Sequence, residues 1–216
     1  MRQEKITVRK TARLVILGNE NNPQRLWILC HGYGQLAAEF AETCRVLDNG
    51  KNLLIFPEGL HRFYSKGAYG RVGASWMTKE ARLDDIQDNF NYLDEVLKMH
   101  KDRFPEAKLV LLGFSQGGAS VCRWLEQSSQ TIDHLVLYGA TFPSDMRSGL
   151  HFGEKVNRDI LFVLGNADPY ISKEEKENQF ELLKKSGKAV KQIDFEGAHD
   201  ILPEVLLELE KHISRH

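Results

Sequence analysis

KLVLLGFSQGGASVCRWLEQ, residues 108–127, joins a short apolar run to a longer helical pattern through the pentapeptide GFSQG. The pentapeptide matches G-x-S-x-G, which forms a tight turn from a strand into a helix. Such a turn strains the backbone of Ser115, and Gly113 and Gly117 remove the Cβ atoms that would collide. The hydroxyl is presented above the sheet, beside a helix N-terminus that favours developing negative charge. The stretch therefore predicts Ser115 as a nucleophile.

Strand and helix patterns alternate along the rest of the chain, which predicts a mostly parallel sheet with helices on both faces. Further strands are expected at 25–30, 52–57, 134–139, 159–165 and 189–195, and helices at 36–48, 79–103, 116–129, 173–186 and 201–214. ITVRK (6–10) and ARLVILG (12–18) are expected to form an antiparallel pair at one edge. We expect one α/β domain over residues 1–216, without a large cap domain.

Two stretches match neither pattern. Residues 58–77 are rich in Gly and aromatic residues, and residues 141–159 stand where a crossover helix is expected. Irregular segments this long inside a compact domain are often functional. We expect both at the carboxyl edge of the sheet, where open α/β sheets bind ligands.

A serine hydroxyl needs a histidine to remove its proton and a carboxylate to hold that histidine. In folds that carry this turn, the chain order is Ser, then Asp or Glu, then His. His199 follows the last expected strand, and Asp168 follows the strand before it, so these two residues are expected to complete a triad with Ser115. Asp145 and Asp194 are weaker candidates for the acid. His212 and His216 lie in or beyond the last helix and are expected at the surface.

HGYG, residues 31–34, closes the strand at 25–30 with small residues that let backbone N–H groups face a ligand. Stabilising a tetrahedral oxyanion requires such groups. The alternative for this segment is a glycine turn with a buried histidine.

HGYG, FPEG, SWM, GFSQGG, GNADPYI and GAHD, in this order and spacing, resemble the phospholipase/carboxylesterase family of α/β-hydrolases, which includes acyl-protein thioesterases. The resemblance covers nearly the whole chain. It implies the α/β-hydrolase fold, the triad named above, and an oxyanion hole formed by the N–H groups of Tyr33 and Gln116. The family's usual H-G-L-G-D reads HGYGQ here, so that Tyr33 and Gln35 stand where Leu and Asp are common. Residues 58–77 also differ from the thioesterase pattern, so activity on lipidated proteins is not assumed.

The composition limits the classes of partner that the protein is expected to bind. The chain has 29 Lys and Arg against 30 Asp and Glu, so there is no basic field for nucleic acid. No stretch approaches the roughly 20 apolar residues of a membrane span, and the N-terminus lacks the apolar core of a signal peptide. Three cysteines at unrelated spacings (Cys30, Cys44 and Cys122) are expected to be buried thiols, and the protein is expected in the cytoplasm. The sequence does not predict an oligomeric state.

These residues predict a carboxylesterase or thioesterase that cleaves small acyl esters through an acyl-enzyme on Ser115, without a metal or organic cofactor. Gly34, Phe63, Tyr64 and Trp76 are candidate substrate contacts, although Phe63, Tyr64, Tyr69 and Trp76 could equally anchor their own loop. Alternatives are a non-catalytic member that binds a small apolar ligand, and a lactonase or peptidase with the same triad. A glycine turn at 113–117 that only packs, or binds phosphate, is a further alternative; no Lys follows to neutralise phosphate.

Overall fold

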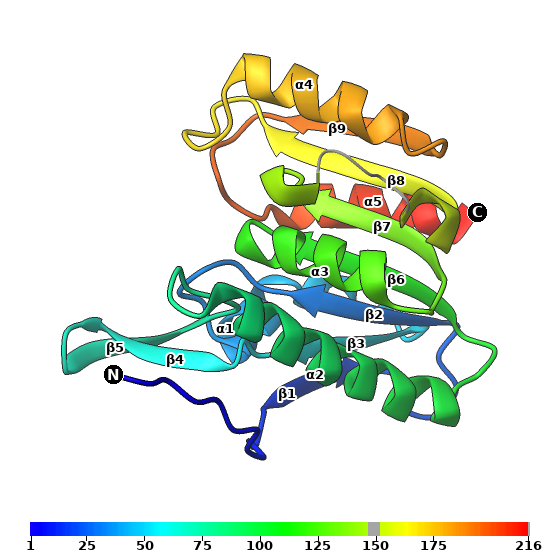
Figure 1. Ribbon diagram of the computed structural model, residues 1–216. Helices are drawn as coiled ribbons and strands as arrows, with labels where there is room; N and C mark the ends of the chain where they lie inside the picture. Colours follow the sequence, from blue (N-terminus) through cyan, green and yellow to red (C-terminus); the bar gives the residue numbers. More distant parts are fainter. Residues whose placement is uncertain (147–151, 216) are drawn as a thin grey trace.

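The computed structural model describes residues 1–146 and 152–215. Within these residues, a sheet of seven strands crosses the molecule (Figure 1). Its strands, in spatial order, are β1 (Leu14–Gly18), β3 (Asn52–Pro57), β2 (Arg25–Cys30), β6 (Lys108–Phe114), β7 (Ile132–Tyr138), β8 (Val156–Gly165) and β9 (Ala189–Phe195). β1 is antiparallel to β3, and every other neighbouring pair is parallel.

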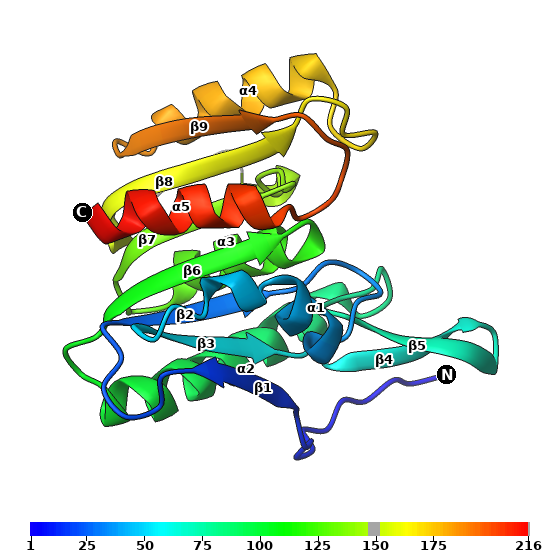
Figure 2. The same cartoon turned by 180° about the vertical axis from the view of Figure 1, so that it is seen from behind.

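Helices cover both faces of this sheet. α2 (Arg82–Arg103), α3 (Gln116–Gln127) and α4 (Lys173–Lys184) pack on one face, and α1 (Ala37–Thr43) and α5 (Pro203–Arg215) on the other (Figures 1 and 2). Two apolar clusters result, one on each side of the strands. Helix α2 turns one apolar face to the sheet, because four residues at three- and four-residue spacing are all buried: Ile86, Phe90, Leu93 and Leu97.

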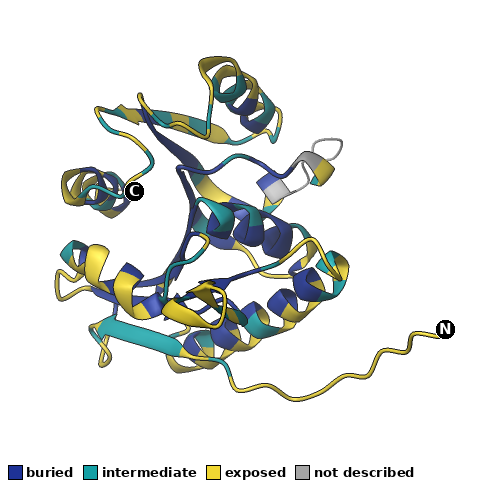
Figure 3. Ribbon diagram, turned by 90° about the vertical axis from the view of Figure 1, so that its left-hand side faces the viewer, coloured by how far each residue is buried: buried dark blue, intermediate teal, exposed yellow. Residues whose placement is uncertain are grey.

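The central strands explain why these runs lack alternation. Every residue of β2 and β3 is buried, and Figure 3 shows the sheet as a buried layer between partly exposed helices. Strands covered on both faces are apolar on both. Fully burying each Leu, Ile or Phe side chain contributes about 1.5–3 kcal/mol, so the sheet is the rigid platform on which its edge loops are built.

Two predictions at the N-terminal side of the sheet are wrong. Residues 6–10 form no strand, and β1 pairs with β3 instead. Ile6 and Val8 are 85% and 71% exposed, so this stretch buries too little apolar surface to compete for the edge. Residues 58–77 are not an irregular loop, because they contain an antiparallel hairpin of β4 (His61–Lys66) and β5 (Tyr69–Ser75).

The stretch 141–159 is only partly described. Short 3-10 turns occupy Ser144–Met146 and Phe152–Lys155, and β8 begins at Val156, earlier than expected. Residues 147–151 lie outside the described residues. Within the described part of the chain, no helix has the length and apolar character needed to cross a membrane.

Candidate active site

Ser115 lies in the turn between β6 and α3, at the carboxyl edge of the sheet. Its backbone has φ +52° and ψ −119°, a conformation that costs a non-glycine residue free energy. The Ser115 N–H donates to the Tyr138 carbonyl at 3.1 Å, which ties the turn to β7. A Cβ atom on Gly113 would overlap the backbone of Gly118, so the turn closes only with glycine there. The tight turn from a strand into a helix that the sequence predicts is therefore present.

The three predicted triad residues lie within hydrogen-bonding distance of one another. His199 Nε2 is 2.9 Å from Ser115 Oγ, and His199 Nδ1 is 2.6 Å from Asp168 Oδ2. Asp168 Oδ1 accepts from the Tyr170 N–H at 2.9 Å, and the Asp168 side chain is 1% exposed. With an ionised carboxylate at Nδ1, the ring carries its proton there and leaves Nε2 to accept from the serine hydroxyl.

Backbone hydrogen bonds tie the loop that carries Asp168 to the loop that carries His199. The Asn166 N–H donates to the Phe195 carbonyl and the Ala167 N–H to the Gly197 carbonyl, both at 2.9 Å. The Gly197 N–H donates back to the Asn166 side chain at 3.2 Å. The two loops therefore hold the acid and the imidazole in a fixed relation.

Two aromatic rings pack against the His199 ring. Phe114 lies 5.1 Å from it, and Tyr170 meets it edge-on at 4.7 Å. Beyond His199 the Leu202 N–H donates to the Tyr138 hydroxyl at 3.1 Å. Burial raises the pKa of Tyr138 to about 12, so the hydroxyl stays protonated at neutral pH. The imidazole is thus held by packing as well as by Asp168.

The turn at residues 32–35 leaves one N–H group available. The Gly32 N–H donates to Gln35 Oε1 at 2.8 Å, the Gly34 N–H to the Ala74 carbonyl at 2.8 Å, and the Gln35 N–H to the Gly32 carbonyl at 3.3 Å. Within the described residues, the Tyr33 N–H has no acceptor, and neither does the Gln116 N–H at the start of α3. The two donors expected for an oxyanion hole are therefore both unoccupied.

His31 supports this turn from below. The ring is fully buried, its Nε2 accepts the Gly59 N–H at 2.9 Å, and its Nδ1 donates to the Gly32 carbonyl at 2.7 Å. Burial lowers the pKa of His31, so the ring stays neutral. Trp76 packs on His31 with ring centroids 5.1 Å apart and donates to its carbonyl at 2.8 Å. Trp76 is completely buried, so it anchors its own segment and does not line the site.

A surface pocket of about 350 Å³ contains the serine and the histidine. Its lining residues are Gly32, Tyr33, Gln35, Phe114, Ser115, Tyr170 and His199. Of the expected substrate contacts, Phe63 reaches the pocket only through Tyr33, on which it stacks at 5.1 Å, and Tyr64 is a 52% exposed hairpin residue outside the lining. Both backbone groups of Gly34 are hydrogen-bonded within the protein.

Sequence reasoning did not propose Phe114 or Tyr170, and it noted Gln35 only as a departure from a family pattern. A usable signal was present for the first two. Phe114 directly precedes Ser115, and Tyr170 follows Asp168 by two residues in the same loop. Side chains this close to reacting residues at one sheet edge are expected to line the same pocket.

The other candidate acids and histidines are engaged elsewhere. Asp145 pairs with Arg123 at 2.8 Å, and Asp194 pairs with Lys176 at 2.7 Å. His212 was expected at the surface, but its side chain is only 17% exposed and contacts Asp159 at 2.6 Å. His216 lies outside the described residues.

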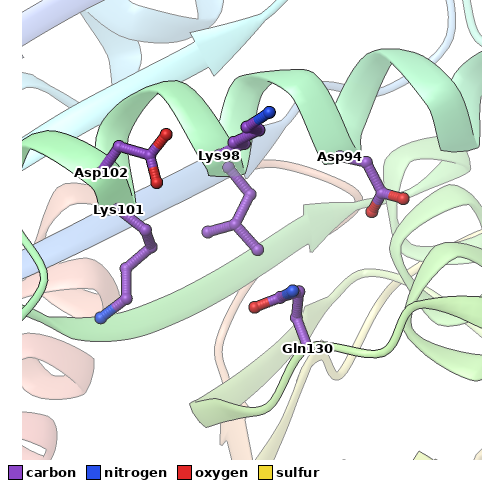
Figure 4. Close-up of a pocket in the computed structure, with 6 residues that line it drawn as sticks. Asp94, Lys98, Lys101, Asp102 and Gln130 are labelled. Carbon is purple, nitrogen blue, oxygen red and sulfur yellow. The ribbon is translucent and has the colours of Figure 1, made fainter.

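A second hollow, of about 280 Å³, lies beside α2, away from the triad (Figure 4). Two acidic and two basic side chains rim it. Asp94 Oδ1 accepts from the Trp124 indole N–H at 2.7 Å, and Lys101 Nζ donates to the Pro105 and Ala107 carbonyls. The hollow holds no nucleophile with a neighbouring base. Among the described residues no cluster of His, Cys, Asp or Glu could hold a metal ion. The three cysteines are buried and unpaired, as predicted.

Comparison with known proteins matches residues 11–216 to the family described as Phospholipase/Carboxylesterase. MhqD of Bacillus subtilis (strain 168) is 21% identical over 182 residues, which cover 81% of this chain and 84% of MhqD. The structure of esterase PE8 has a TM-score of 0.75 at 15% identity, over 95% of this chain and 99% of that chain. The Bacillus cereus carboxylesterase has a TM-score of 0.73 at 15% identity, over 94% of each chain. These structures share the fold of this chain.

Proposed function

The chain belongs to the phospholipase/carboxylesterase family of α/β-hydrolases, and from this premise we propose that it hydrolyses small acyl esters or thioesters through an acyl-enzyme. The observation that carries the proposal is the series of contacts at 2.9 Å from Ser115 to His199 and at 2.6 Å from His199 to Asp168. Three residues from three separate loops meet at one edge of the sheet in the order that proton transfer requires.

Ser115 Oγ attacks the acyl carbonyl carbon while its proton moves to His199 Nε2. Asp168 holds the ring by its Nδ1–H and stabilises the imidazolium that forms. The N–H groups of Tyr33 and Gln116 donate to the oxyanion, and each such donor contributes about a hundred- to a thousandfold to turnover. His199 then protonates the departing alcohol or thiol. Water, deprotonated by His199, attacks the acyl-enzyme, and His199 returns the proton to Ser115 Oγ as the ester bond breaks and the acid is released.

The size and the aromatic lining of the pocket favour small substrates that carry an apolar group. Tyr33 and Tyr170 are 63% and 78% exposed, and both line the pocket that holds Ser115. Exposed aromatic rings at a concave site are typical of ligand contacts. We propose these two rings as the substrate contacts in place of Tyr64 and Trp76, with Phe63 supporting Tyr33 from behind.

A binding protein without catalysis is the rival from another class. The strained backbone of Ser115 argues against it, because φ +52° costs free energy that binding alone does not require. A lactonase or peptidase would use the same residues, so the leaving group must be identified by substrate comparison.

The test is hydrolysis of p-nitrophenyl esters of increasing acyl length by the wild type and by Ser115→Ala, with thioester, lactone and anilide substrates alongside. We expect the wild type to hydrolyse the short esters and Ser115→Ala to lose on the order of a million-fold in turnover. Ser129→Ala, at an exposed serine outside the site, is the control and should keep wild-type rates. A Ser115→Ala variant within tenfold of the wild type, or failure of a fluorophosphonate to label the folded protein, would contradict the proposal.

A further inference from the structure

Among the described residues that line the pocket with Ser115 and His199, Gln35 carries the one neutral amide side chain. Its main chain is held at both ends, because its N–H donates to the Gly32 carbonyl at 3.3 Å and its carbonyl accepts from the Ala74 N–H at 3.2 Å. Its side-chain Oε1 accepts from the Gly32 N–H at 2.8 Å. The residue is therefore fixed in place rather than free to turn into solvent.

The contact with Gly32 also fixes the orientation of the Gln35 carboxamide, that is, which of its two terminal atoms, Oε1 or Nε2, faces the Gly32 N–H. A backbone N–H is only a donor, so the atom opposite it must be the oxygen of Gln35 and not the nitrogen. The Nε2 group, with two N–H donors, is left at the other end. Within the described residues this group has no hydrogen-bond acceptor.

We propose that Gln35 determines substrate specificity, donating from Nε2 to an acceptor oxygen on the acyl chain of the substrate. This inference rests on the proposed ester hydrolysis at Ser115. In that reaction the leaving group lies beside His199 Nε2, which protonates it. The oxyanion then faces the Tyr33 N–H, and the acyl chain is the remaining substituent, which extends over the pocket lining that includes Gln35.

The Gln35 side chain lines the same pocket as Ser115 and His199 and contacts the Gly32 N–H, so its donor lies close to the reacting carbon. Gly32 is adjacent to Tyr33, the residue whose N–H faces the oxyanion, and neighbouring Cα atoms are about 3.8 Å apart. The Gln35 amide therefore reaches the first few atoms of the acyl chain and not its far end. The substrate class is an ester whose acyl group carries an ether, hydroxyl, keto or carboxylate oxygen near the carbonyl.

The experiment compares two substrates of the same shape, p-nitrophenyl methoxyacetate and p-nitrophenyl butyrate, which differ by one oxygen in place of a methylene. The readout is the ratio of their kcat/KM values in each protein. The methoxy group also changes intrinsic reactivity, but it does so equally in every variant, so this effect cancels when ratios are compared. Gln35→Glu keeps an acceptor for the Gly32 N–H and removes the donor, and Gln35→Met removes both.

We expect the methoxyacetate-to-butyrate ratio to fall about fivefold in both variants, the size of one ordinary hydrogen bond. Gln35→Met should also lose turnover on both substrates, because the turn is no longer held. Gln130→Glu and Gln130→Met, at an exposed glutamine of the hollow in Figure 4, should leave the ratio unchanged.

An unchanged ratio in a folded Gln35→Glu protein overturns the inference, even if both rates fall. That result would assign Gln35 to holding the turn or to donating to the oxyanion, which serves every ester alike. Absence of hydrolysis in the wild type would instead reject the proposed function itself, so the two failures are distinguishable.

Discussion

Gly117, two residues after Ser115, shows how tightly α3 is packed against the sheet. A Cβ atom at this position would overlap the carbonyl groups of Cys30, the last residue of β2, and of His31, which precedes the turn at residues 32–35. The first turn of α3 therefore lies directly on the backbone of β2. This contact sets the separation between the Gln116 N–H and the Tyr33 N–H, the two donors proposed for the oxyanion.

Gly117→Ala should therefore cost both stability and activity. The added methyl group has rigid backbone as its neighbour and cannot be accommodated by a side-chain rotation, so we expect a loss of about 3 kcal/mol in unfolding free energy. Gly50→Ala is the matched control, because Gly50 has φ +77° with open space around it and should lose only about 1–2 kcal/mol. Urea unfolding and kcat/KM of both variants make the comparison. Equal stability of the two would show that the close packing of α3 on β2 is not rigid.

The β4–β5 hairpin packs against the turn at residues 32–35 and holds it by hydrogen bonds and a ring contact. The Gly34 N–H donates to Ala74 of β5, and the Ala74 N–H donates to Gln35. Phe63 of β4 stacks on Tyr33, with ring centroids 5.1 Å apart. Because successive strand residues point to opposite faces, Tyr64 is directed away from that stack. The hairpin therefore supports the pocket without forming its floor.

Phe63→Ala should weaken substrate binding by freeing the Tyr33 ring. We expect KM to rise several-fold for esters with an apolar acyl chain, in line with the roughly 0.5–1.5 kcal/mol of an aromatic pair, while kcat stays within about twofold. Tyr64→Ala removes a ring of similar size from the adjacent position and should leave both constants unchanged. If Tyr64→Ala raises KM as much as Phe63→Ala does, the hairpin contacts the substrate through its other face.

Apolar pattern and turn chemistry decided which elements could be predicted from the sequence. The bounds of β2, β3, β6 and β9 agree with the expected ranges, because each apolar run begins at, or directly after, a Lys or Arg residue. Helix α4 was expected at 173–186 and begins at Lys173, with Ser172 as its N-cap, whose Oγ accepts from the Glu175 N–H at 3.1 Å. The hairpin at 58–77 could not be predicted, because its strands are largely exposed and lack an apolar alternation.

The site could be predicted in part for a related reason. Ser115, Asp168 and His199 follow β6, β8 and β9, which run parallel in one sheet, so the topology alone brings them to one edge, and the predicted α/β-hydrolase fold is confirmed. The pocket lining depends on which way side chains point, and sequence position does not fix this. Trp76, which could have been a substrate contact or an anchor of its own segment, is buried against His31 and is the anchor.

At the scale of the whole molecule, the proposed catalytic residues and a cluster of charged residues that stabilises the fold lie at different positions along the sheet. The triad occupies the carboxyl edge, whereas Asp159, early in β8, lies among groups from two other elements. Its Oδ1 contacts Nδ1 of His134 in β7, and its Oδ2 lies 2.6 Å from Nε2 of His212 in α5. His212 Nδ1 is in turn 3.3 Å from Lys191 of β9. This cluster links both strands flanking β8 to the last helix.

Asp159→Asn should therefore change acid stability without changing catalysis. Burial opposes ionisation of Asp159, but hydrogen bonds from His134 and His212 outweigh it and lower the pKa from 3.8 to about 2. As the pH falls, the unfolded chain binds this proton first, so the stabilisation is complete above about pH 4 and is lost as the pH falls towards 2. Near pH 6 we expect Asp159→Asn to be less stable than the wild type by on the order of 2 kcal/mol, with the difference shrinking below pH 4. Urea unfolding between pH 6 and pH 2.5 measures it, with Asp102→Asn at an exposed site of α2 as control. A difference that stays constant over this range would mean that the carboxylate charge does not contribute.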